Sequence, residues 1–76
     1  MTLTDFVANF AEQLEETDPE TITADTEFRT IDEWSSLTAL SIIAMVDDEY
    51  DIQLKGNDMR AAQTIGELFD IVVAKA

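Results

Sequence analysis

The feature that most constrains the fold is a stretch of helical periodicity from Ile31 to Tyr50. Within it, apolar residues recur at i, i+3, i+4, i+7 and i+11, the spacing of the face that an amphipathic helix buries. These residues are Ala39, Ile42, Ile43, Val46 and Tyr50. A neighbouring stripe consists of Leu37, Leu40 and Ala44, flanked by the hydroxyls of Thr38 and Ser41. A small helical protein needs one such stripe for its core, so the second stripe predicts a surface for partners.

Three other segments also have helix signals. An apolar stripe predicts a first helix that begins after Thr2 or Thr4, runs to about Glu16 and stops before the proline. The members of this stripe are Leu3, Phe6, Val7, Phe10 and Leu14. A capping box of Thr64 and Glu67 predicts a last helix to about Ala74. Between them, Asn57 is expected to cap a short helix over residues 58–62.

The connections carry their own apolar anchors. Residues 17–32 lose the helical period, and Ile22, Phe28 and Ile31 predict a long loop pinned to the core, with a turn of helix near Pro19. Residues 51–54 predict an extended connector that buries its two aliphatic side chains. We therefore expect residues 1–76 to form a single all-α domain. Its architecture is a small four-helix bundle with three main helices, a short third helix and a long first loop.

Charge restricts the partners. The chain has 17 acidic and 4 basic residues, a formal net charge of −13. Such a chain repels phosphate backbones and anionic membrane surfaces, which argues strongly against nucleic-acid binding. It attracts partner enzymes with basic docking patches. No apolar run approaches membrane-spanning length, so we expect no membrane insertion. We expect a cytoplasmic protein, since the opening ten residues have neither the basic nor the unbroken apolar region of a signal peptide. We also expect it to be a monomer.

The residue inventory also argues against catalysis. The chain has no cysteine and no histidine, which excludes disulfides, the usual zinc sites and Cys/His nucleophiles. The one window that resembles a calcium loop has Thr23 where glycine is needed and Arg29 where glutamate is needed. We expect no catalytic residue and no metal site.

The central helix is preceded and begun by the sequence Trp34-Ser35-Ser36. One of Ser35 and Ser36 is expected to cap the helix, because serine is preferred there. A serine on such a corner also suits the attachment of a phosphodiester, which free N–H groups and the helix dipole both favour. Trp34 is expected to pack its ring over the end of the bundle.

Ser35-Ser36-Leu37, followed by a helix that ends in Asp47-Asp48-Glu49-Tyr50, resembles the acyl carrier proteins, whose motif is Asp-Ser-Leu. The likeness extends over nearly the whole chain, up to the Thr64–Leu68 opening of the last helix. It implies that Ser36 carries 4′-phosphopantetheine, which a phosphopantetheinyl transferase takes from coenzyme A. Acyl groups are then held as thioesters for acyl-transferring and chain-elongating enzymes. It also implies that the partner surface comprises Leu37, Leu40, Ala44, Asp47 and Asp48.

The chain departs from the family pattern beside the attachment serine. Ser35 stands where the family has aspartate, and Glu33-Trp34 stand where glycine is usual. Thr38 and Ser41 occupy positions where acids are common. These changes favour a dedicated carrier over one that serves a general fatty-acid synthase. Two alternatives stay open, an aminoacyl or peptidyl carrier and an acidic interaction module without a prosthetic group.

Overall fold

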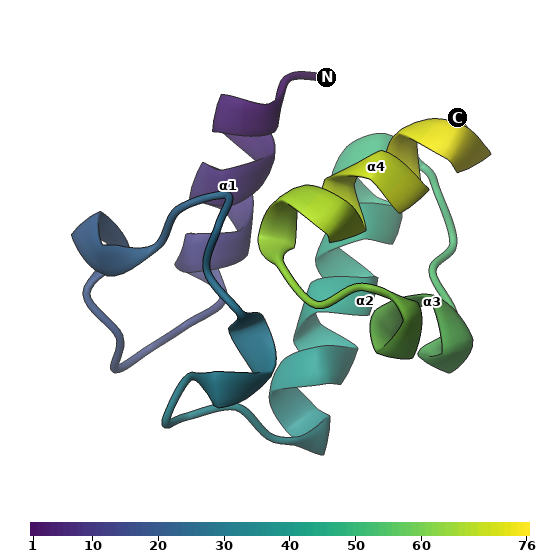
Figure 1. The fold of residues 1–76 in the computed structure, drawn as a ribbon. Helices are drawn as coiled ribbons and strands as arrows, with labels where there is room; N and C mark the ends of the chain where they lie inside the picture. Colours follow the sequence, from purple (N-terminus) through teal and green to yellow (C-terminus); the bar gives the residue numbers. More distant parts are fainter.

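The computed structural model describes all residues from 1 to 76 and contains four α-helices (Figure 1). The helices are α1 (Leu3–Glu12), α2 (Ser36–Tyr50), α3 (Gly56–Ala61) and α4 (Ile65–Lys75). Two short 3-10 helices, η1 (Pro19–Thr21) and η2 (Phe28–Thr30), interrupt the connection between α1 and α2. The prediction of an all-α fold with three main helices, a short third helix and a long first loop is confirmed. No helix is long and apolar enough to cross a membrane.

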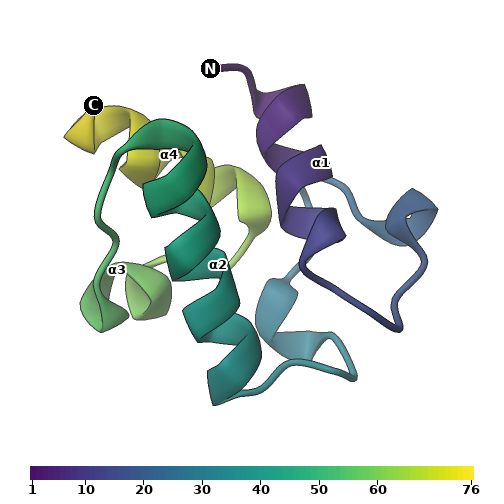
Figure 2. The same cartoon turned by 180° about the vertical axis from the view of Figure 1, so that it is seen from behind.

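Helix α2 runs through the middle of the molecule. Seen from either side, it lies between α1 and α3, and its first turns lie close to η2 (Figures 1 and 2). Helix α4 packs against both α1 and α3. The beginning of α2 is therefore placed at one end of the bundle, between the long first loop and the short third helix.

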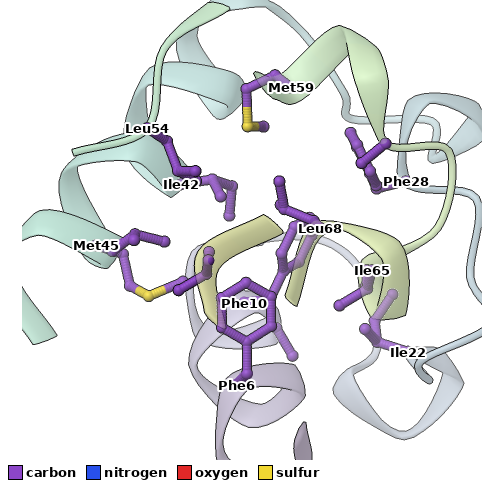
Figure 3. Packing of buried hydrophobic residues seen from close by; sticks show 14 of the residues in the cluster. Phe6, Phe10, Ile22, Phe28, Ile42, Met45, Leu54, Met59, Ile65 and Leu68 are labelled. Carbon is purple, nitrogen blue, oxygen red and sulfur yellow. The ribbon is translucent and has the colours of Figure 1, made fainter. Parts of the chain in front are cut away.

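The core is entirely apolar: the structure buries sixteen apolar side chains and no polar one. Those with no exposed surface are Phe6, Phe10, Phe28, Ile42, Val46, Ile65, Leu68 and Val72. They come from α1, η2, α2 and α4 and belong to one cluster, in which Figure 3 shows Phe10, Ile42 and Ile65 around Leu68. The predicted stripe of α2 lies on this side, with Ile42 and Val46 fully buried and its other members partly buried. Met45 is also buried, although it lies outside that stripe.

The long first loop is pinned to the core, as predicted. Ile22 and Phe28 are buried and Ile31 is partly buried, and the expected turn near Pro19 is η1. The loop also bonds to the start of α4, where the Gly66 N–H donates to the Ala24 carbonyl at 2.8 Å. A Cβ on Gly66 would lie 3.2 Å from that oxygen, so glycine permits the close approach.

The predicted end of α1 is wrong. The helix stops at Glu12 and not near Glu16. The proline does not cause this, because the rule before proline restricts Asp18 alone. Instead, the backbone N–H groups of Glu15 and Glu16 donate to the carboxylate of Glu33, each at 3.1 Å. These amides have a partner outside the helix, and the chain turns away to reach it.

The short third helix also begins earlier than predicted. It starts at Gly56, two residues before the expected start, and ends at Ala61. Asn57 is not its cap. The Asp58 carboxylate accepts from the Lys55 N–H at 2.9 Å, which fixes the first turn from inside the helix. By contrast, the capping box of α4 is confirmed, with Glu67 N–H donating to Thr64 Oγ1 at 3.1 Å.

Candidate functional site

The two serines at the start of α2 have different surroundings. Ser35 precedes the helix with extended backbone, and its Oγ accepts from the Thr38 N–H at 3.3 Å. Ser35 is therefore the N-cap, and its hydroxyl is used by the helix. Ser36 is the first helical residue, its side chain is exposed, and no hydrogen bond forms at its hydroxyl. Of the two, only Ser36 presents a free hydroxyl to solvent.

The turn before the serines is held without glycine. The Glu33 carboxylate, which accepts from the Glu15 and Glu16 amides, also accepts from Thr17 Oγ1 at 2.5 Å. The backbone carbonyl of Glu33 in turn accepts from Thr38 Oγ1 at 3.0 Å. Glu33 thus ties the first loop to the first turn of α2. This role was missed from the sequence, since no periodicity marks a carboxylate whose partners lie more than fifteen residues away.

These contacts shift the ionisation of Glu33. The hydrogen bond from Thr17 chiefly, and those from the Glu16 and Glu15 amides, hold the pKa of its carboxyl below the usual 4.5. Partial burial opposes the shift without cancelling it. At neutral pH the carboxylate is therefore charged and suited to its three donors.

Trp34 closes the end of the bundle, as predicted. Its ring lies nearly parallel to that of Phe10, with centroids 6.2 Å apart. It meets the ring of Phe28 at a steep angle, with centroids 5.0 Å apart. Both partners are fully buried, so the partly buried indole continues the core up to the residue before the two serines.

A groove of about 480 Å³ opens beside Ser36. It lies between η2, the first two turns of α2, and α3. Its apolar lining consists of Phe28, Trp34, Ala39, Leu40, Ile43 and Met59, and its remaining lining of Arg29, Ser35, Ser36, Gly56 and Arg60. None of the chain's seventeen acidic residues lines it. The groove is therefore an apolar and weakly cationic surface on a strongly anionic protein.

The two arginines of the groove were not predicted as site residues. Arg29 Nη1 donates to the carbonyls of Met59 and Ala62 at 2.8 and 2.7 Å, and its guanidinium lies 5.2 Å from the centre of the Phe28 ring. It fastens the end of α3 to η2. Arg60 donates to the side-chain oxygen of Asn57 on the same helix.

The predicted partner residues all lie exposed along α2. Leu37 has 76% and Leu40 has 60% of its surface exposed, and Ala44 is exposed as well. Asp47 and Asp48 follow near the other end of the helix. At 1.5 Å per residue, Asp48 lies about 18 Å along the axis from Ser36. The structure thus puts these residues along the exposed side of α2, with the apolar members toward the serine and the acids far from it.

Comparison with known proteins identifies the class. A family model described as a phosphopantetheine attachment site matches residues 5–72. The chain therefore belongs to the phosphopantetheine-attachment family and is a phosphopantetheine carrier protein. Carrier domains of this family are generally non-catalytic and interact with a phosphopantetheinyl transferase and with biosynthetic enzymes. Comparisons with curated proteins and with solved structures gave no match.

The residues present suit this prosthetic group. A free exposed hydroxyl is available at Ser36, and no acid lies in the first turn of α2 to repel a phosphodiester. When bound, phosphopantetheine supplies a terminal thiol that holds an acyl group as a thioester. Because the chain has no cysteine, it has no thiol of its own for this purpose.

Proposed function

We propose that this chain is an acyl carrier protein and that Ser36 is the residue that bears its phosphopantetheine. The observation that carries the assignment is the contrast between the two serines. Ser35 Oγ accepts a hydrogen bond as the helix cap, whereas Ser36 Oγ is exposed and unpaired. A transferase can therefore reach Ser36 without unravelling the helix.

In the attachment step, Ser36 Oγ forms a bond to the phosphorus next to pantetheine in coenzyme A. The phosphoanhydride bond of coenzyme A breaks, 3′,5′-adenosine bisphosphate leaves, and the hydroxyl proton passes to solvent or to a base of the transferase. The chain's own contribution is positional, since Glu33 and Thr38 hold the turn that presents the serine.

The exposed side of α2 is the proposed docking surface. Leu37, Leu40 and Ala44 offer partner enzymes an apolar contact next to the serine. Asp47 and Asp48 supply negative charge that steers enzymes with basic patches. The transferase and the acyl-transferring and chain-elongating enzymes are the proposed partners of this surface.

The proposed setting is a monomeric single domain, residues 1–76, in the cytoplasm. It serves the synthesis of fatty acids, polyketides or related secondary metabolites. Ser35, Glu33 and Trp34 replace the aspartate and glycine of the usual motif, and Thr38 and Ser41 leave the serine end of α2 without acids. A partner that reads this end must rely on apolar and hydroxyl contacts, which supports a dedicated set of enzymes.

Intact-mass measurement tests the assignment. Purified chain is incubated with coenzyme A and several phosphopantetheinyl transferases, alongside Ser36→Ala and Ser35→Ala. We expect the wild type and Ser35→Ala to gain one phosphopantetheine and Ser36→Ala to gain none. A modification that survives Ser36→Ala, or failure of every transferase on a folded wild type, refutes the proposal.

A further inference from the structure

The groove beside Ser36 has a charge opposite to that of the rest of the molecule. Acids make up 17 of 76 residues, yet none is among the eleven residues that line the groove. Two of the chain's four basic residues, Arg29 and Arg60, do line it. The lining of the groove therefore carries two cationic groups and no carboxylate.

The two arginines differ in what they are free to do. The Arg29 guanidinium already donates to two backbone carbonyls and lies over the Phe28 ring, so it is held in place by the fold. Arg60 bonds only to the exposed side chain of Asn57, one turn earlier on α3. The Arg60 guanidinium lies beside Gly56 and is not crowded there, because even an added Cβ on Gly56 would lie 3.6 Å from Arg60 Nη1. Arg60 is therefore the cation that can turn toward a ligand.

The remaining lining suits a short apolar chain. The accessible apolar lining consists of the exposed Leu40 and the partly buried Trp34, Ala39 and Ile43, whereas Phe28 is fully and Met59 nearly buried. A volume of about 480 Å³ lies within the range of small-molecule pockets, which are mostly apolar with a few polar groups that fix orientation. Here the charged groups that can fix orientation are guanidiniums.

We propose that the arginines of this groove, chiefly Arg60, favour an acyl cargo with a terminal carboxylate over one with a terminal ammonium. This inference rests on the proposed attachment at Ser36. A guanidinium pairs with a carboxylate through two parallel hydrogen bonds. An ammonium group in the same place is repelled by the same guanidiniums. The groove thus favours a dicarboxylic acyl group over an aminoacyl group as cargo.

The test uses three cargoes of matched length. The chain is loaded at Ser36 with amide-linked analogues of succinyl, butyryl and β-alanyl pantetheine, which differ only in ending in a carboxylate, a methyl or an ammonium. The amide link removes differences in thioester hydrolysis. Trp34 is the sole tryptophan and lines the groove, so its emission reports occupancy. NMR shifts of Ala39, Ile43 and Met59 give the ratio of bound to free cargo.

We expect the bound-to-free ratio to fall in the order succinyl, butyryl, β-alanyl. Arg60→Gln should lower the succinyl ratio about two- to fivefold and leave butyryl unchanged, as expected for one exposed ion pair. Lys55→Gln is the matched control, because it removes the same charge from a residue outside the groove. Arg60→Lys should restore part of the preference. The phosphodiester is common to all three cargoes, so differences among them report the cargo alone.

Two kinds of failure are distinguishable. If intact mass shows no loading at Ser36, the proposed function itself fails. If loading succeeds but succinyl and β-alanyl give equal occupancy, the cargo inference is refuted and the carrier assignment stands. Equal losses in Arg60→Gln and Lys55→Gln also refute it, because they reduce the effect to net charge.

Discussion

The two sides of α2 use the same residue types for opposite purposes. On one side, Ile42 and Val46 are fully buried in the apolar core. On the other, Leu37 and Leu40 leave 76% and 60% of their surfaces in solvent. Burying a side chain of this size contributes roughly 1.5–3 kcal/mol, so the exposed leucines forgo most of that stabilisation. The comparison shows that one side supports the fold and that the other is available for recognition.

The largest expected effect is a difference in stability between a variant on the buried side of α2 and a variant on its exposed side. Ile42→Ala should lower the free energy of unfolding by about 2–5 kcal/mol, because it removes buried methyl groups and leaves a cavity. Leu40→Ala should change it by less than about 0.5 kcal/mol, because the side chain is mostly exposed. Urea unfolding followed by circular dichroism measures both. Equal losses in the two variants would mean that α2 has no free side.

Recognition by the transferase should depend on the exposed side of α2 more than its stability does. Leu37→Ala is expected to leave the unfolding free energy nearly unchanged and to lower kcat/KM of the transferase reaction about tenfold, the effect of losing an apolar anchor at an interface. Steady-state kinetics at several carrier concentrations measure it. Wild-type kinetics in Leu37→Ala would remove the exposed stripe from the docking surface.

A smaller effect is expected at the loop that precedes α2. Glu33→Gln should lower the melting temperature at pH 7, because the neutral amide accepts more weakly from Thr17 and the two amides of the first loop. The pKa of Glu33 is lowered in the folded state, so its stabilisation is full above the ordinary pKa of 4.5 and is lost as the pH falls through the folded-state pKa. The gap between wild type and variant should therefore close in acid.

Glu16→Gln is the matched control for this loop. It removes the same charge from an exposed side chain that makes no hydrogen bond of its own, while its backbone amide keeps the contact with Glu33. Thermal melts between pH 7 and pH 3 compare the three proteins. A gap between wild type and Glu33→Gln that persists unchanged in acid would contradict the ionic nature of the contact.

The smallest effect lies at the far end of the exposed side. Asp47 sits in the last turn of α2, where the helix dipole disfavours negative charge. Asp47→Asn should raise the unfolding free energy by about 0.3–1 kcal/mol and slow association with a basic partner. Chemical denaturation and stopped-flow binding at low salt measure the two changes. A loss of stability would show that the acid is held by a favourable contact.

The parts of the fold that follow from local sequence patterns could be predicted from the sequence. Helical spacing located the buried face of α2, and the cap signals located the start of α4. The cap of α2 and the exposed stripe beside Ser36 follow from the same local rules. Met45 was missed because packing from several sides widens the buried face beyond a single stripe.

Contacts between distant segments could not be predicted. Glu33 meets residues 15–17, and Arg29 meets carbonyls thirty or more residues away, at Met59 and Ala62. Neither pairing has a spacing that a single sequence displays, because both arise only after the loop has folded over the bundle. For the same reason the early end of α1 and the cationic lining of the groove became visible only in the structure.

The most direct test of the central claim is the mass of the chain isolated from its native host, followed by peptide mapping. The carrier assignment predicts one added phosphopantetheine, with or without an acyl group, on the peptide that contains Ser36. The same mass should be absent from Ser36→Ala expressed in that host. A chain that is always isolated at the mass of its residues alone, or one modified elsewhere, would contradict the assignment.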